Sequence, residues 1–292
     1  DEVEISPDGC TIKASTSQSF TNPSESWSAS TTIELTLAGD QGSGTYTKSN
    51  GGFCNGNQQG KLTATDAAAG DALGTAVGLS GDLVAAGAPG ADLAGKTDAG
   101  AAYVFVRVGV AWSQQQKLVA SDGSADDQFG LTLSLSGYTV AVGAPNAAPL
   151  ARVGLGAAYL YFRSAGTWSE QAKIFASDGA PGDHYGSAVA ISSDSVIVGV
   201  PAFNVGSMAD AGAFYTARRS GTTWTTEPRK AAPDNGNSYY FGKSVALTSD
   251  TAIVGAPYAR AAYVFVRSGA AWVEQAKIAS PDTAGDSFGN TV

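Results

Sequence analysis

The sequence predicts an all-β protein, a β-propeller built from four-stranded antiparallel blades. The first observation is an internal repeat, in which an aromatic residue or leucine followed by glycine recurs at spacings of 56, 56, 56 and 47 residues. These pairs are Leu73-Gly74, Phe129-Gly130, Tyr185-Gly186, Phe241-Gly242 and Phe288-Gly289. The second is the alternation of apolar residues within a unit, as in Leu131, Leu133 and Leu135, which is the period of a strand. Four short strands repeated at about 40 to 60 residues are typical of propeller blades.

Each unit divides into four strands, and the second unit illustrates their order. Alternating apolar residues place its first strand at 129–136 and its second at 139–145. The second strand ends in Gly-Ala-Pro, and proline ends a strand because it lacks the N–H donor. The third strand is expected at 157–163, and the fourth, which opens on tryptophan, at 168–177. The complete units are 61–116, 117–172, 173–229 and 230–276, followed by a partial unit at 277–292.

The chain is expected to consist of a polar arm at 1–30 and the propeller at 31–292. Ser and Thr make up 18 of the first 60 residues, which is typical of a solvated arm. The alternative is a strand that pairs with a neighbouring subunit, because an extended arm can add to an exposed sheet edge.

The number of blades stays open at this point. Residues 61–65 match a fourth strand, so 32–37 and 44–48 would supply the strands that close a fifth blade around the four complete ones. The rival interpretation is a truncated part of a larger ring.

Composition excludes two classes of partner. The formal net charge is −9 and the 17 Lys and Arg residues form no run, which argues against binding to the phosphate backbone of a nucleic acid. No stretch approaches 18 consecutive apolar residues, so no membrane span is expected.

Cys10 and Cys54 are the only cysteines, and they form no CxxC pair. We expect a disulfide between them, with two buried free thiols as the alternative. A disulfide persists in an oxidising compartment, so the protein is expected to be secreted or at the cell surface.

The repeat resembles a known family. The Phe-Gly pair, the Gly-Ala-Pro about fourteen residues later and the strand AAYVFVR at 101–107 are similar to the FG-GAP repeat, found in the propeller of integrin alpha chains and in many bacterial and algal surface proteins. The resemblance covers residues 61–292. It implies an extracellular, seven-bladed propeller used for adhesion or partner binding, often with calcium.

The usual calcium site of this family is expected to be absent. Many members carry Asp-x-Asp-x-Asp-Gly between the first two strands of a blade, which supplies the oxygen ligands that Ca²⁺ needs. The corresponding connections here are 136–138, 192–194 and 248–250, and each holds at most one carboxylate.

Any bound Ca²⁺ is instead expected where one unit meets the next. Asp122 and Asp127, and likewise Asp178 and Asp183, lie five residues apart across a turn that contains glycine. Two carboxylates at this spacing suit one cation. Capping of free backbone amides explains the same aspartates without a metal, and this structural interpretation is preferred.

No catalytic constellation stands out, and the protein is expected not to be an enzyme. His184 is the only histidine, so no second one is available for a triad, and no Gly-x-Ser-x-Gly elbow occurs. Paired carboxylates for glycoside hydrolysis remain a weak alternative, because any two aspartates of the loops may lie at the needed separation.

Residues that break the repeat are the better candidates for binding. Trp and Tyr residues that recur once in every unit are expected to pack between blades. The candidates that depart from the repeat are Tyr239, Tyr240, Tyr258, Phe203 and Trp27.

The function expected from these features is a non-enzymatic extracellular adhesion or assembly module that acts through protein–protein contacts. Its partners would be other surface proteins or copies of itself, and it would serve as a subunit of a surface structure. A carbohydrate-binding lectin is the alternative, and a glycoside hydrolase is the weaker one. No sequence feature identifies the ligand.

Overall fold

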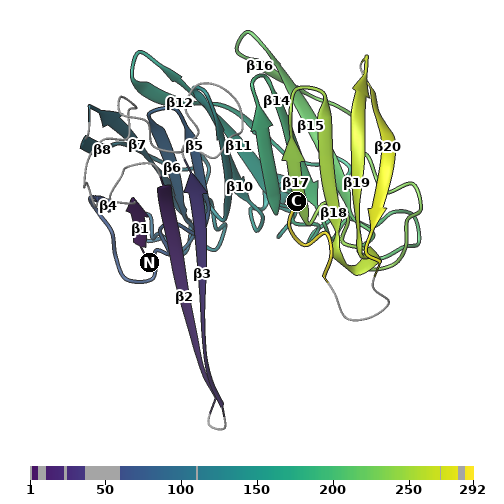
Figure 1. Ribbon diagram of the computed structural model, residues 1–292, viewed down its shortest axis with the longest axis horizontal. Coiled ribbons are helices and arrows are strands. Elements are labelled where there is room, and N and C mark those ends of the chain that lie inside the picture. The colour runs from purple at the N-terminus through teal and green to yellow at the C-terminus, as the bar shows by residue number, and fades with distance from the viewer. Residues whose placement is uncertain are drawn as a thin grey trace.

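The computed structural model describes residues 2–5, 11–22, 25–36, 60–109, 111–269, 271–281 and 287–292. Five antiparallel sheets of four strands each make up the described fold (Figure 1). Four of these sheets are consecutive blades, and in each blade the spatial order of the strands follows the sequence.

The blades follow the repeat units. The first blade contains β5 (Val77–Ser80), β6 (Leu83–Ala88), β7 (Ala101–Val108) and β8 (Ala111–Leu118). The second contains β9 (Thr132–Ser136), β10 (Thr139–Ala144), β11 (Ala157–Ser164) and β12 (Thr167–Ile174). The third contains β13 (Ala188–Ser192), β14 (Ser195–Val200), β15 (Ala213–Ser220) and β16 (Thr223–Thr226). The fourth contains β17 (Ser244–Leu247), β18 (Thr251–Ala256), β19 (Ala261–Ser268) and β20 (Ala271–Ala279).

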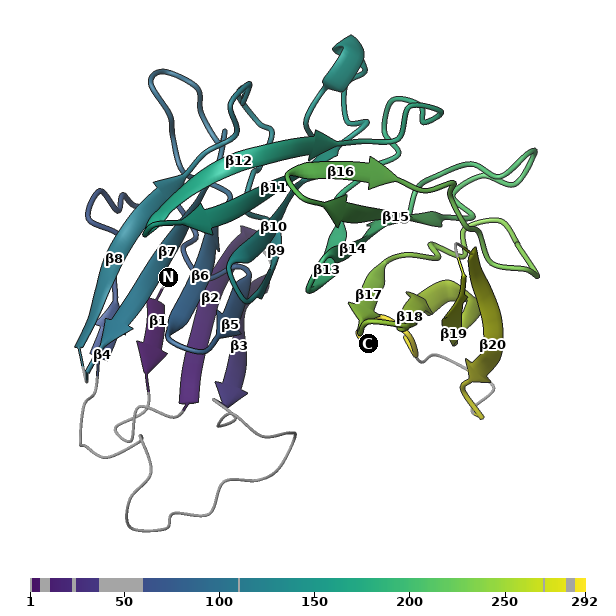
Figure 2. The same cartoon turned by 90° about the horizontal axis from the view of Figure 1, so that it is seen from above.

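The blades stand side by side along an arc. Figure 2 shows β5, β9, β13 and β17 on its inner side and β8, β12, β16 and β20 on its outer side. Neighbouring inner strands contact one another in succession. The predicted propeller architecture of four-stranded blades is confirmed, whereas closure of a ring stays a prediction.

Apolar side chains of adjacent blades interlock to form the core. Between the first and second blades, Leu118 packs with Phe129, Tyr159 and Trp168, all at most 2% exposed. Burial from both sides explains why β6, β10 and β14 are apolar or small along their whole length. The recurring Tyr and Trp residues are therefore packing residues, as expected.

The Phe-Gly and Gly-Ala-Pro motifs meet where blades touch. Gly130 has φ of 96°, a left-handed conformation that glycine adopts without strain. Its carbonyl oxygen lies against Gly87 of the preceding blade so closely that a Cβ atom at Gly87 would overlap it. The two motifs thus mark a backbone-to-backbone contact that only a residue without a side chain permits.

The N-terminal residues form a fifth sheet. It contains β1 (Glu2–Ile5), β2 (Thr11–Asn22), β3 (Glu25–Thr36) and β4 (Gly60–Leu62), in the order β3-β2-β1-β4. The segment 1–30, expected as a separate arm, thus supplies strands that pair within the chain. The strand expected at 32–37 lies largely in β3, whereas 44–48, Cys10 and Cys54 lie outside the described residues.

The third blade departs from the others at its outer strand. β16 has four residues, whereas β8, β12 and β20 have eight or nine. Pro228 follows two residues after β16, and proline cannot donate a ladder hydrogen bond. Glu227 N still donates to Thr216 O, and Lys230 pairs again with Phe214, so the two residues between Glu227 and Lys230 bulge away from β15.

Helical structure in the described part of the chain is confined to two single turns, η1 (Pro149–Ala151) and η2 (Pro257–Ala259). Neither they nor any other described segment is a helix long and apolar enough to cross a membrane.

Candidate functional site

The candidate site is the end of the blades where two kinds of loop meet. One loop enters the first strand of a blade, and the other joins the second and third strands of the blade before it. Backbone hydrogen bonds tie them together, from Gln128 N to Asp98 O, His184 N to Gly154 O and Tyr240 N to Asp210 O, each 3.0 Å long. We call this surface the loop face.

One position on the loop face combines a fixed backbone with variable chemistry. The residue before each of the first four aromatic-glycine or leucine-glycine pairs is Ala72, Gln128, His184 or Tyr240, with φ of 57°, 56°, 59° and 51°. A left-handed conformation costs a residue other than glycine on the order of 1 kcal/mol. The repeat keeps this backbone while the side chain changes, so the chemistry at this position differs from one blade junction to the next.

Tyr240 and Tyr258 form an aromatic pair on the fourth blade. Their ring centroids are 5.0 Å apart at an angle of 43°, and Tyr258 is 73% exposed. The Tyr240 hydroxyl points to a carboxylate oxygen of Asp210 at 3.5 Å. The negative charge of Asp210 raises the pKa of Tyr240 above its ordinary value. The cluster therefore offers exposed aromatic surface beside a carboxylate.

The equivalent positions of the other blades carry polar groups. The Gln128 side-chain oxygen accepts a hydrogen bond from the Asn146 amide at 3.0 Å. The His184 Nδ1 atom lies 3.1 Å from the carbonyl oxygen of Pro145. The loop face thus presents an amide, an imidazole and two phenols at successive blade junctions.

The structure separates the predicted partner residues. It brings Tyr240 and Tyr258 together, and the ring of Tyr239 lies over Gly236. The prediction that Phe203 binds a partner is corrected by its burial. Phe203 is only 6% exposed and packs against Tyr215 under the guanidinium of Arg229. Trp27 lies on β3, where its backbone pairs with Phe20. Asp210 was not among the predicted binding residues, although it lies in a loop that departs from the repeat.

Two of the four predicted metal ligands hold adjacent strands instead. Asp122 accepts hydrogen bonds from the Tyr159 hydroxyl at 2.8 Å and from Lys173 Nζ at 2.6 Å. Asp178 accepts them from the Tyr215 hydroxyl at 2.6 Å and from Arg229 at 2.8 Å. Asp234 repeats the arrangement in the fourth blade. This recurrence indicates a structural clamp.

The other two predicted metal ligands cap turns. Asp127 accepts the backbone N–H of Ser124 at 2.7 Å, and Asp183 accepts that of Ala180 at 2.6 Å. Both are nearly fully buried, and burial raises their pKa values. Among the residues that the structure describes, no group of three or more His, Cys, Asp or Glu is arranged to hold a metal ion. Binding of Ca²⁺ at these aspartates stays a proposal. An ion there would have to displace the hydrogen bonds that the carboxylates accept.

At pH 7, the free energy of unfolding of Asp183→Asn is expected to equal or exceed that of wild type, because Asn keeps an acceptor for Ala180 N–H without a buried charge. Asp183→Ala should lose about 1 kcal/mol. Folding raises the pKa of Asp183, so its carboxyl contributes to stability below the pKa of the unfolded state. This contribution is lost as the pH rises through the pKa of the folded state. Any advantage of Asp183→Asn over wild type in the free energy of unfolding should therefore vanish below about pH 4, as measured by urea unfolding.

The same variant tests calcium binding. We expect 5 mM CaCl₂ to change the Tm of wild type and Asp183→Asn equally. A calcium-dependent rise in Tm that Asp183→Asn abolishes would contradict the capping role and support the metal site.

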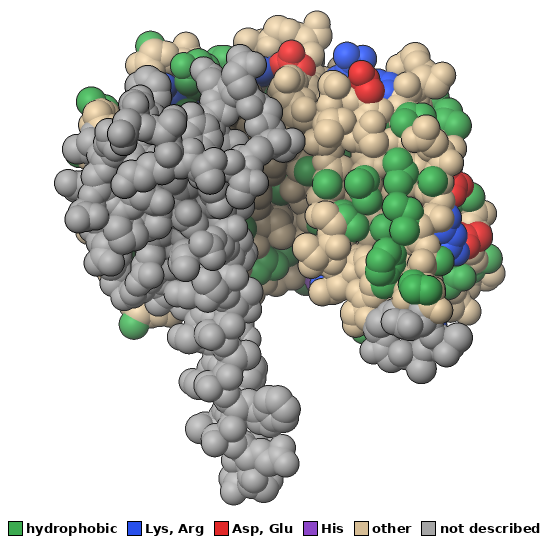
Figure 3. All heavy atoms as spheres, viewed as in Figure 1, with side chains coloured by type: hydrophobic (Ala, Val, Ile, Leu, Met, Phe, Trp, Pro, Cys, Tyr) green, Lys and Arg blue, Asp and Glu red, His purple; other side chains and the backbone are tan. Residues whose placement is uncertain are grey.

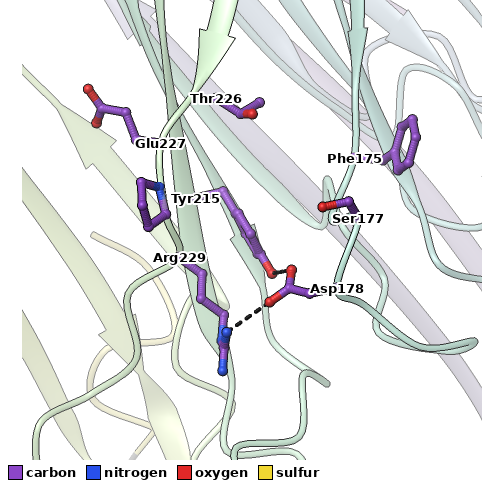
Figure 4. A pocket seen from close by; sticks show the side chains of 8 residues that line it. Phe175, Ser177, Asp178, Tyr215, Thr226, Glu227 and Arg229 are labelled. Carbon is purple, nitrogen blue, oxygen red and sulfur yellow. Dashed lines mark hydrogen bonds and ion pairs between the residues drawn. The ribbon is translucent and has the colours of Figure 1, made fainter.

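A pocket of about 360 Å³ opens beside the short strand β16. Its lining residues are Phe175, Ser177, Asp178, Tyr215, Thr226, Glu227, Pro228 and Arg229 (Figure 4). The Tyr215 hydroxyl and Arg229 both point to Asp178, and Glu227 is paired with Arg267. The charged groups of this pocket are thus already compensated, which makes the loop face the stronger candidate.

The comparisons with known proteins concern the repeat and the fold. The sequence model of the FG-GAP repeat family matches the chain four times, at residues 57–105, 112–161, 168–217 and 224–271. Among solved structures, a putative 6-phosphogluconolactonase from Bacteroides uniformis is 10% identical, with 96% of this chain and 68% of that chain covered and a TM-score of 0.47. Kluyvelomyces marxianus Hsv2 is 10% identical, with 96% and 99% covered and a TM-score of 0.42. No curated protein matches the chain.

Proposed function

This chain belongs to the FG-GAP repeat family, and we propose that it is a non-enzymatic adhesion or assembly module that works outside the cell through protein–protein contacts. The family repeats point to a propeller that serves as a protein-interaction module. The extracellular setting is supported by the cysteine pair and by a composition poor in lysine.

The observation that carries the proposal is the Tyr240–Tyr258 pair beside Asp210. Exposed tyrosines supply large contact area at low entropic cost, and they are enriched where proteins bind one another. Rigid support comes from the hydrogen bond between Tyr240 N and Asp210 O and from the single turn η2 that carries Tyr258. Partner proteins with basic and apolar groups suit this cluster.

A non-enzymatic role fits the groups present on the loop face. His184 is the only histidine, and its Nδ1 atom lies within hydrogen-bond distance of a backbone carbonyl. The carboxylates of Asp122 and Asp178 are engaged by cations and phenols of the blades. These groups stabilise the fold, and the proposal gives none of them a reacting substrate.

Tyr258→Ala is expected to weaken partner binding about tenfold or more without a change in stability, because the ring is exposed and central to the aromatic cluster. Beads coated with the protein are incubated with intact cells of the source organism, and bound beads are counted. Tyr138→Ala is the matched control, since Tyr138 is 57% exposed on the β9–β10 connection away from the loop face.

Two treatments of the cells distinguish a protein partner from a glycan. A protein partner predicts that protease treatment removes binding while periodate oxidation of glycans leaves it. The opposite result would favour a lectin, which the same cluster also suits, because an aromatic ring stacks on a sugar and Asp210 accepts from its hydroxyls. Equal loss in Tyr258→Ala and Tyr138→Ala would refute the loop face as the binding surface.

A further inference from the structure

The second blade holds a carboxylate of its own outer strand in a set of hydrogen-bond donors. Glu170, on β12, accepts from the backbone N–H of Ser121 at 3.1 Å and from the Ser121 hydroxyl at 2.9 Å. The hydroxyl of Tyr161 donates to the same carboxylate at 3.1 Å. Because Ser121 lies in the segment that leads from the first blade into the second, this carboxylate links the two blades.

The first and fourth blades also leave no unmatched donor at this position. In the first blade the side-chain oxygen of Gln114 accepts the backbone N–H of Thr65 at 2.8 Å. In the fourth blade Pro233 stands in the place of Ser121, and proline has no N–H to be matched. In these three blades the backbone N–H at this position is therefore either bonded to a side-chain oxygen or absent.

The third blade keeps the donors and loses the acceptor. By the spacing of the repeat, Ser177 is the equivalent of Ser121, whereas Thr226 replaces Glu170 and removes the carboxylate. Within the described part of the chain, no residue accepts a hydrogen bond from the backbone N–H or the hydroxyl of Ser177. Ser177 thus presents to solvent two donors that the equivalent serine directs to a carboxylate.

The pocket of about 360 Å³ beside β16 lies at these donors. Ser177 and Thr226 both line it, together with the half-buried ring of Phe175 and the exposed ring of Pro228. Figure 4 shows the Ser177 hydroxyl directed into the pocket and the carboxylate of Glu227 directed away from it. Small-molecule sites measure about 300–1,000 Å³, so this pocket suits a ligand built on a single ring.

Arg229 adds a cation to the pocket. One of its terminal nitrogens lies 2.8 Å from Asp178, and the guanidinium carries further N–H donors. Such pairing recurs at the upper edge of the molecule in Figure 3, where Lys and Arg side chains lie beside Asp or Glu. In the second blade Lys173 pairs with Asp122 in the same way while Glu170 is bound nearby. An ion pair at this position therefore does not prevent a carboxylate from binding beside it.

We propose that this pocket binds a hexuronic acid, whose carboxylate takes the place that Glu170 has in the second blade. The backbone N–H and hydroxyl of Ser177 hold the carboxylate, as those of Ser121 hold Glu170. The rings of Phe175 and Pro228 offer apolar surface to the C–H groups of the sugar, and the remaining N–H groups of Arg229 are available to its oxygens. None of these residues belongs to the aromatic cluster of the loop face, so the inference is independent of the proposed function.

The test follows the backbone N–H of Ser177 by proton–nitrogen correlation NMR of the full chain while sodium glucuronate is added at constant ionic strength. We expect a saturable shift of the Ser177 resonance, whereas glucose, which lacks the carboxylate, should leave it in place. The N–H of Ser121 is the internal control, because it is already bonded to Glu170 and should not respond. The α-amide of N-acetylglutamate presents the carboxylate of a glutamate side chain and should bind at least tenfold more weakly than glucuronate.

Two variants of β16 complete the test. Thr226→Glu restores the acceptor of the second blade and should weaken glucuronate binding at least tenfold. Thr223→Glu is the matched control and should bind like wild type, because Thr223 is exposed on the same strand and does not line the pocket. The proposal is overturned if glucuronate leaves the Ser177 N–H unshifted, if glucose or the glutamate amide binds as tightly, or if the two variants bind glucuronate equally.

Discussion

Gly199→Ala is expected to destabilise the protein by about 3 kcal/mol or more, because no side-chain movement relieves the clash that it creates. A Cβ atom at Gly199, on β14, would overlap the carbonyl oxygen of Gly242 at the start of the next blade. Gly242 is itself fixed, with φ of 92° and its N–H bonded to Gly255 O at 3.0 Å. Two blades must therefore separate to make room. Urea unfolding followed by tryptophan fluorescence measures the loss.

Gly123→Ala is the matched control for this substitution. A Cβ atom there would meet Ala120 at 3.4 Å, an ordinary van der Waals contact, and the backbone of Gly123 does not lie in the left-handed region. We expect its free energy of unfolding to stay within about 0.5 kcal/mol of wild type. Similar losses in the two variants would show that the cost comes from the replacement of a glycine as such and not from contact between blades.

The sequence was sufficient to predict the blades because their determinants are local and repeated. Alternation in Leu131, Leu133 and Leu135 and the Gly-Ala-Pro at strand ends recur in register, so each copy confirms the others. The shortened β16 was also foreseeable in principle, since Pro228 stands where Gln116 and Ala172 stand in other units. The N-terminal sheet was less predictable, because β1, β2 and β3 share none of the repeat motifs.

The candidate site was harder to predict because it depends on contacts between distant residues. Asp122, Tyr159 and Lys173 each recur by unit, but their hydrogen bonds join residues 37 and 51 positions apart, which a spacing argument does not reveal. Phe203 was chosen because it departs from the repeat, but this departure does not reveal that its ring packs against Tyr215. Tyr240 and Tyr258 were chosen because both depart from the repeat, and the structure brings their rings together, whereas their role in binding stays a prediction.

Glu227→Ala is expected to cost about 3 kcal/mol, because it leaves a buried guanidinium without its counter-ion. Arg267 is 6% exposed and Glu227 18%, and Glu227 accepts from both terminal nitrogens of Arg267, at 2.9 and 3.2 Å. Glu227→Gln restores the residue type of Gln115 and Gln171 and should cost only about 1 kcal/mol. The free energies of unfolding in urea at pH 7 compare the two variants.

The smaller cost of Glu227→Gln follows from two buried donors. In wild type, Arg267 Nε and Trp272 Nε1 have no hydrogen-bond partner. At the first junction the oxygen of Gln115 accepts from the equivalent Arg163 Nε and Trp168 Nε1. A glutamine at 227 is expected to take the same geometry, so it gives up charge attraction but satisfies donors that glutamate leaves unpaired.

The pH dependence of stability separates the charge of Glu227 from its packing. Burial alone would raise the pKa of Glu227, but hydrogen bonds from Arg267 and Thr216 outweigh it and hold that pKa below its ordinary value of 4.5. A lowered folded pKa gives stability that is present above the unfolded pKa and is lost as pH falls through the folded one. The advantage of wild type over Glu227→Gln should therefore be full at pH 7 and shrink below about pH 4.5. A difference that stays constant down to pH 3 would mean that shape, and not the ion pair, joins the third and fourth blades.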